Sequence, residues 1–132
     1  MARIEFTEPE AQLHGTFCGL TYRVINGSQH THLQLPDPLP RHPTAADRER
    51  HRRRQVIMWA VGTIQMMLFE QGQTKSVERM QQLADQYKTF YMHAARKYDE
   101  WHDRFDDNKR FARAIAYWYV TDKHPPEFPD FR

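Results

Sequence analysis

The residues best suited to chemistry in this chain are arginines that crowd the start of a predicted helix. They are Arg48, Arg50, Arg52, Arg53 and Arg54. Residues 41–54 carry six arginines against two carboxylates, a formal charge of +4, whereas the whole chain carries only +2. Guanidinium groups bind phosphate oxygens through paired hydrogen bonds, and phosphate contacts dominate binding to nucleic acids. The run predicts a phosphate-binding surface; the alternative is a solvated helix end that pairs with acidic side chains of the same protein.

A second group of candidate residues flanks Asn26-Gly27. This dipeptide favours a two-residue hairpin loop, because such a loop needs positive φ at both positions. The resulting register sets Arg23 opposite His30 and places Arg23, His30 and His32 on one face of the ribbon. A two-stranded ribbon can enter a major groove, so this face predicts secondary contacts to nucleic acid. The alternative is an ordinary wet face of a sheet.

The sequence offers little for catalysis, a cofactor or a metal. His14 and Cys18 are the one nucleophile and base pairing worth naming, and a packed thiol is the simpler interpretation. Asp99, His102, Asp103 and Asp106 recur at helical spacing. A carboxylate-bridged metal bundle needs such a unit twice, so we expect an exposed ladder there. His30 and His32 lack a third local ligand. We therefore expect no enzyme activity, no cofactor and no metal.

Proline and helix-capping residues delimit the elements that hold these side chains. Four prolines fall within residues 36–43, where we expect a stiff, extended connector. Thr44, with Asp47 behind it, predicts the start of a first helix. That helix should run from about residue 45 to about residue 71.

Two more helices are predicted after the first. The apolar residues from Val77 to Phe105 recur at intervals of three and four, which favours one long helix beginning at Ser76. Its short connection to the first helix makes the two antiparallel. Asp106–Asn108 supplies a break and a new cap, so that a third, shorter helix should occupy about residues 108–121.

We therefore expect one compact α+β domain dominated by helices. Its parts are an N-terminal β-hairpin region (1–35), a proline-rich connector (36–43), a three-helix region (44–122) and a tail rich in proline and phenylalanine (123–132). Arg3–Thr7 alternates and is a candidate for a third short strand. The middle of the first helix, Val56–Phe69, is apolar on more sides than two neighbouring helices cover. We expect a homodimer or a higher assembly.

Composition restricts the cellular setting. Hydrophobic residues make up 39% of the chain and charged residues 27%, and no apolar run reaches the length of about 18 residues that a membrane span needs. The first residues lack the basic-then-apolar plan of an export signal. We expect a cytoplasmic protein without a membrane partner. The single cysteine excludes an internal disulfide.

Several of these features occur together in a recurring pattern. It consists of Gly15-x-x-x-Gly19-Leu20-Thr21-Tyr22-Arg23-x-x-Asn26-Gly27, the proline-rich connector, and Phe111-x-x-Ala114-x-Ala116-x-x-Tyr119 before Pro125-Pro126. The pattern resembles small proteins of Bacteroidetes genomes and of their mobile elements and phages, a group without an established activity. The resemblance implies nucleic-acid handling, particle assembly or interference with a host system.

Two functional hypotheses follow. The leading one is a small, non-enzymatic nucleic-acid-binding protein that contacts phosphates through the five arginines. The alternative is a self-assembling or partner-capturing protein, such as a virion component or an inhibitor of a host complex. In that case the basic helix end would meet an acidic protein surface.

Overall fold

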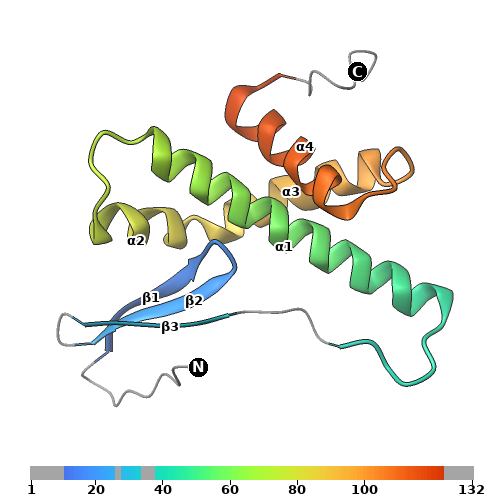
Figure 1. Cartoon of the computed structure of the whole chain (residues 1–132), viewed down its shortest axis with the longest axis horizontal. Helices are drawn as coiled ribbons and strands as arrows, with labels where there is room; N and C mark the ends of the chain where they lie inside the picture. Colours follow the sequence, from blue (N-terminus) through green and yellow to red (C-terminus); the bar gives the residue numbers. More distant parts are fainter. Residues whose placement is uncertain (1–10, 26–27, 34–37, 124–132) are drawn as a thin grey trace.

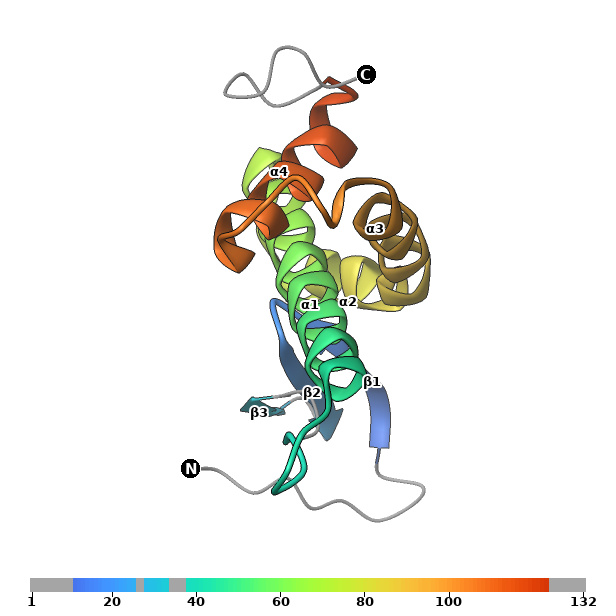
Figure 2. The same ribbon diagram turned by 90° about the vertical axis from the view of Figure 1, so that its right-hand side faces the viewer.

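Four helices and a small sheet make up the described part of the chain. The computed structural model describes residues 11–25, 28–33 and 38–123. Helix α1 runs through the middle of the molecule, with α4 on one side and the sheet on the other (Figures 1 and 2). The prediction of a helix-dominated chain is confirmed. The candidate strand Arg3–Thr7, the Asn26-Gly27 loop and the tail from residue 124 lie outside the described residues.

Helix α1 spans Ala45–Gln71, the predicted bounds. The Thr44 hydroxyl accepts a hydrogen bond from the Asp47 backbone N–H at 3.1 Å, and the Asp47 carboxylate accepts one from the Thr44 N–H at 2.9 Å. This reciprocal pair satisfies two N–H groups that the helix itself leaves unpaired. The predicted cap of the first helix is confirmed.

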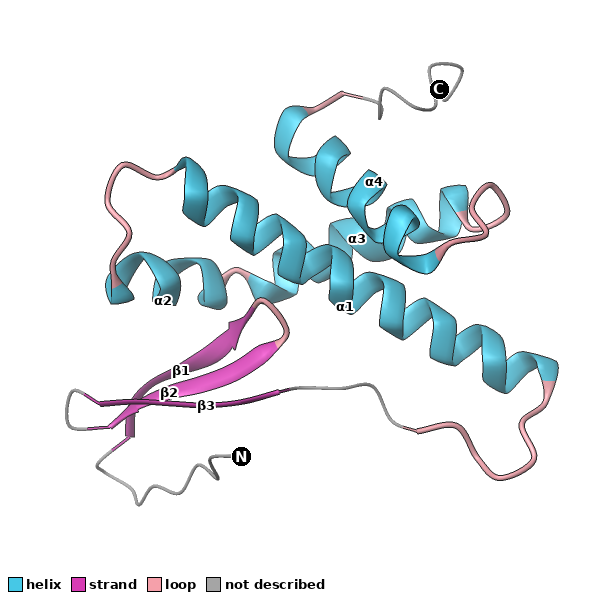
Figure 3. Cartoon of the chain, viewed as in Figure 1, coloured by secondary structure: helices cyan, strands magenta, loops and turns pink. Residues whose placement is uncertain are grey.

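The long second helix predicted from Ser76 is wrong, because the segment forms two helices (Figure 3). Helix α2 spans Val77–Asp85 and α3 spans Tyr87–Trp101, separated by Gln86 at φ −89° and ψ 7°. Neither proline nor glycine marks this break. We attribute it to tertiary packing, because α2 packs mainly against β1 whereas α3 packs mainly along α1.

Helix α4 spans Asn108–Thr121, again the predicted bounds. The Asp107 carboxylate accepts hydrogen bonds from the backbone N–H groups of Lys109 and Arg110 at 2.9 and 3.1 Å. These bonds hold the pKa of Asp107 below its usual value. The acidic break that the sequence indicates before residue 108 is therefore a working helix cap.

The sheet has three antiparallel strands in the order β1-β2-β3, which span Ala11–Phe17, Leu20–Ile25 and Ser28–Leu33. Strands β2 and β3 pair in the predicted register, with Arg23 opposite His30. Strand β1 was not predicted, although its residues alternate in polarity. A two-residue turn joins it to β2, with Cys18 at φ 55° and Gly19 at φ 78°.

A buried glutamine fastens the sheet to the helices. The Gln65 side chain is fully buried; its Oε1 accepts from the Cys18 backbone N–H at 2.7 Å, and its Nε2 donates to the Thr16 and Leu83 carbonyls at 2.6 and 3.3 Å. One turn away, a Cβ added to Gly62 would lie 3.2 Å from the Cys18 backbone. The absence of a side chain at residue 62 allows the β1–β2 turn to lie directly on α1.

The core lies where α1 meets α3 and α4. On α1 the fully buried apolar residues are Val56, Ile57, Ala60, Val61 and Ile64. Stacked rings join α3, α4 and the loop between them, with centroids 5.0 Å apart for Tyr98 and Phe111 and 4.7 Å apart for Phe105 and Phe111. This aromatic stack lies beside the basic half of α1, so the predicted arginine surface borders the core.

Candidate functional site

Arg52 is bonded into the fold. Its Nε donates to the Asn108 side chain at 2.9 Å, and its two Nη atoms donate to the His102 and Phe105 carbonyls at 3.1 and 2.7 Å. Its guanidinium carbon lies 5.7 Å from the centre of the Tyr98 ring. To bind a phosphate as a planar fork, Arg52 would have to give up these contacts. Its geometry suits a structural arginine better than a phosphate ligand.

Arg53 faces a carboxylate of the same chain. Its Nε and Nη2 donate to the two oxygens of Asp99 at 3.1 and 3.3 Å, which further raises the pKa of Arg53. Both side chains are well exposed, and exposed ion pairs contribute only about 0–1 kcal/mol. This pair is the arrangement that the alternative interpretation of the basic run predicts.

Acidic neighbours occupy further positions near the start of α1. Arg50 pairs with Asp47, one turn before it. The buried Tyr98 donates a hydrogen bond from its hydroxyl to the Glu49 carboxylate. Burial is the main cause that raises the pKa of Tyr98 well above its usual value, and this hydrogen bond is the second cause. The surface around the arginines thus has mixed charge.

Two helices carry exposed cations in this part of the molecule. On α1 they are Arg48, Arg50 and Arg54; on α4 they are Lys109, Arg110 and Arg113. The Lys109 ammonium lies 6.0 Å from the centre of the Trp59 ring, so the first turn of α4 lies beside the middle of α1. Sequence reasoning missed the α4 cations, although their spacing on a predicted helix was a usable signal.

The second candidate group forms part of a row across the sheet. Arg23 pairs with His30 on one side and with His14 on the other, while His32 pairs with Thr21. The register therefore adds His14 to the face predicted to hold Arg23, His30 and His32. The side chains of these residues lie outside the description.

The predicted acidic stripe is not a single helical stripe. Helix α3 ends at Trp101, so that Asp103 and Asp106 belong to the loop that follows it, while Asp99 lies on the helix. Within residues 11–25, 28–33 and 38–123, no three side chains of the metal-ligating types gather into a site.

Cys18 lies in the β1–β2 turn and is half-buried. Burial, with a smaller contribution from the negative charge of Glu70, raises the pKa of its thiol to about 11. A thiol with so high a pKa is a poor nucleophile at neutral pH. This environment agrees with the packing role preferred for Cys18 from the sequence.

Large apolar side chains remain on the surface of α1. Trp59 and Met66 are 38% and 41% exposed, although the same helix supplies much of the core. They are seven residues apart and share one helix face with Thr63. Other exposed apolar residues are Leu20, Leu39, Val77 and Met92. Trp59 and Met66 form the α1 stripe, a candidate contact surface that the sequence predicted only as excess apolar surface.

Comparisons add no further assignment. Comparison of the chain with protein-family models, curated proteins and solved structures finds no match. None of the helices in the described part combines the length and the apolar character that crossing a membrane requires.

Proposed function

We propose that this chain is a small, non-enzymatic α+β protein that assembles with itself, as a building block of a larger particle or complex. The observation that carries the proposal is the α1 stripe, where Trp59 and Met66 stay exposed on the helix that organises the core. The intramolecular contacts of Arg52 and Arg53 support assembly over nucleic-acid binding, because they occupy two of the five predicted phosphate ligands.

Burial of the α1 stripe alone does not supply enough free energy for a stable dimer. Full burial of a large apolar side chain contributes about 1.5–3 kcal/mol, so burying the exposed remainder of Trp59 or Met66 contributes about 1 kcal/mol. A two-fold dimer would gain about 4 kcal/mol from four such side chains. Association costs about 4–15 kcal/mol, so a second surface is needed.

The sheet provides such a surface. Among the described residues, β3 contacts only β2, and its outer edge carries no backbone pairing. Its sequence, Ser28–Leu33, lacks the lysine and proline that blunt many edge strands. We propose that this edge acts together with the α1 stripe in self-assembly.

Light scattering coupled to size-exclusion chromatography tests the proposal. We expect the wild-type chain to elute as a dimer or larger species, and the double variant Trp59→Ser with Met66→Ser to shift toward monomer. The matched control is Val77→Ser with Met92→Ser, which removes two exposed apolar side chains from other helices. Circular dichroism verifies that both variants keep their helices. A monomeric wild-type chain at tens of micromolar contradicts the proposal.

A second candidate, nucleic-acid binding, is supported by the cations that α4 adds beside α1. Residues 38–123 carry 16 basic and 11 acidic residues, a formal charge of +5. On this hypothesis Arg48, Arg50 and Arg54, with Lys109 and Arg113, contact phosphates. Arg23, His30 and His32 stay secondary contacts.

Salt dependence and co-purification separate the two candidates. A nucleic-acid-binding chain should carry an elevated 260/280 nm absorbance ratio that high salt removes. Each neutralised phosphate adds about 0.9 to the slope of log affinity against log salt. A variant in which Gln replaces Arg48, Arg50 and Arg54 should show a lower slope. The control variant has Gln in place of Lys75, Lys88 and Arg96. Equal slopes in the two triple variants would remove this candidate.

A further inference from the structure

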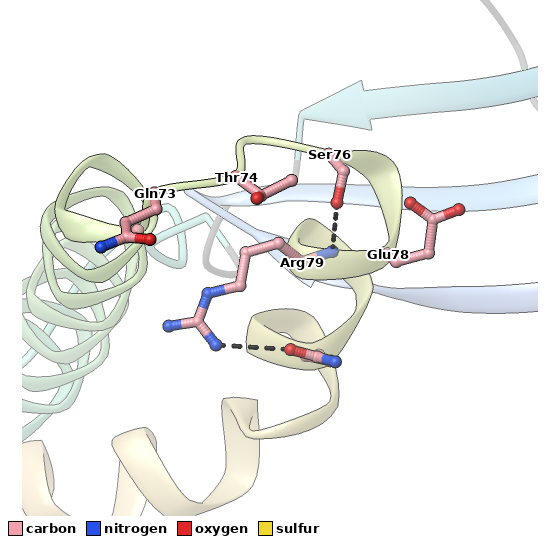
Figure 4. Close-up of a pocket in the computed structure, with 7 residues that line it drawn as sticks. Gln73, Thr74, Ser76, Glu78 and Arg79 are labelled. Carbon is pink, nitrogen blue, oxygen red and sulfur yellow. Dashed lines mark hydrogen bonds between the residues drawn. The ribbon is translucent and has the colours of Figure 1, made fainter.

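A polar hollow lies at the turn between α1 and α2 (Figure 4). Its volume is about 380 Å³. The residues that line it are Gly72, Gln73, Thr74, Ser76, Glu78, Arg79 and Gln82. Most of these side chains can donate or accept hydrogen bonds, so the hollow suits a small polar group rather than an apolar one.

Arg79 supplies the charge of this hollow. Its guanidinium extends from α2 beneath the Gln73–Thr74 segment of the turn (Figure 4). In the described part of the chain the side chain makes one hydrogen bond, from Nη1 to Oε1 of Gln82 at 3.4 Å. That distance exceeds the usual 2.7–3.2 Å range, and a guanidinium has five N–H donors. Most of its donor capacity is therefore unused.

The neighbouring groups do not neutralise Arg79. Glu78 points away from the guanidinium, on the other side of the first turn of α2 (Figure 4). The Ser76 hydroxyl caps α2 by accepting the Arg79 backbone N–H at 3.2 Å. The described residues thus leave this cation without a carboxylate partner, in contrast to Arg53 with Asp99.

The shape of the turn keeps the space beside Arg79 open. A Cβ added to Gly72 would lie 3.3 Å from the Phe69 carbonyl oxygen and 3.8 Å from Nε of Arg79. A larger side chain at residue 72 would therefore fill the hollow next to the guanidinium.

We propose that this hollow binds a single carboxylate, from an acidic side chain or chain terminus of a protein partner, through the fork of Arg79. A carboxylate matches the two parallel N–H donors of a guanidinium. One cation with Glu78 at the rim favours a monoanion over a phosphate dianion. Gln73 and Thr74 also line the hollow, and their side chains can donate hydrogen bonds to a carboxylate. This site is separate from the α1 stripe, so either can fail alone.

Nuclear magnetic resonance tests the site with three probes at matched ionic strength: acetate, inorganic phosphate and a capped Gly-Glu-Gly peptide. We expect saturable shifts of the Arg79 Nε–H and of backbone signals within residues 72–82 for acetate and the peptide. Arg79→Gln should weaken binding at least tenfold, whereas Arg96→Gln, an exposed arginine on α3, should leave it unchanged.

A second variant keeps the arginine and blocks the site. Gln82→Glu places a carboxylate beside Arg79 and should abolish binding of both carboxylate probes without loss of helix content. Stronger binding of phosphate than of acetate would contradict the carboxylate assignment. Shifts that do not saturate, or that survive both variants, would overturn the proposal.

Discussion

The Nε–H of Arg52 donates a hydrogen bond to Oδ1 of Asn108 at 2.9 Å, which joins the third turn of α1 to the first residue of α4. The same guanidinium binds the carbonyls of His102 and Phe105, which follow the end of α3. Carbonyls at a helix C-terminus lack partners within the helix and favour a nearby cation. Arg52 therefore caps the C-terminus of α3 at His102 and also holds the α3–α4 loop at Phe105.

Replacing Arg52 should destabilise the fold. We expect Arg52→Gln to lower the free energy of unfolding by about 2–3 kcal/mol, because hydrogen bonds to charged groups contribute about 1.5–3 kcal/mol and the Asn108 side chain and the partly buried Phe105 carbonyl lose their donor. Arg52→Lys should restore only part of this loss, since an ammonium does not reproduce the planar fork. Urea denaturation measures both variants.

The control for Arg52 is Arg48, one turn earlier and exposed. Arg48→Gln should change the free energy of unfolding by no more than about 0.5 kcal/mol, as surface substitutions usually do. Equal effects at the two positions would contradict the structural role assigned to Arg52.

Local signals account for what the sequence could predict. The bounds of α1 and α4 followed from Thr44 with Asp47 and from Asp107, because a cap and the turn it begins are adjacent in the chain. Arg48 and Arg52, in contrast, have the same side chain and lie one turn apart. Only the packing of the α3–α4 loop distinguishes them, and that loop is about 50 residues away.

The break at Gln86 could not be predicted for the same reason. The surrounding sequence continues a helical pattern, and only tertiary packing ends α2 at this residue.

The sequence gives a weak indication of the role of Gln65, because it is one polar residue inside an apolar run. A polar residue surrounded by core positions needs buried partners, so its role as an anchor could have been anticipated. Its partners Thr16 and Cys18 could not, since neither β1 nor the turn that follows it was predicted.

Gln65 should tolerate no apolar replacement. Gln65→Leu removes the acceptor of the partly buried Cys18 N–H and the donor to the Thr16 and Leu83 carbonyls. A buried polar group that loses its partner costs about 1–3 kcal/mol. We expect a loss of about 3 kcal/mol in the free energy of unfolding. Gln71→Leu, at the exposed end of α1, is the matched control. A similar small effect of both changes on thermal unfolding would refute the anchoring role.

Cys18 should react slowly while the protein is folded. Its thiol pKa of about 11, against an ordinary value of 9.0, leaves about 100-fold less thiolate at pH 8 than in the unfolded chain. Alkylation by iodoacetamide at pH 8, with and without guanidinium chloride, measures this ratio. Equal rates in both solutions would contradict the buried environment.

The raised pKa of Cys18 also predicts a loss of stability in alkali. The folded state favours the protonated thiol, so its contribution is fully present below about pH 9 and is lost as the pH rises to about 11. Cys18→Ala removes this titration. Its unfolding temperature should therefore fall less than that of the wild type between pH 9 and pH 11.

Asp107 should contribute to stability in the opposite pH range. Hydrogen bonds from the Arg110 and Lys109 backbone lower its pKa below the ordinary 3.8, so the charged cap is stabilising above that value. The contribution is lost as the pH falls through the lowered pKa of the folded state. Asp107→Asn keeps a good capping side chain that does not titrate. The unfolding temperature of Asp107→Asn should match that of the wild type near pH 6 and decline less between pH 4 and pH 2. The control is Asp106→Asn, on the neighbouring exposed residue, whose unfolding temperature should follow the wild type throughout. Parallel curves for wild type and Asp107→Asn would show that the Asp107 carboxylate does not couple acid titration to folding.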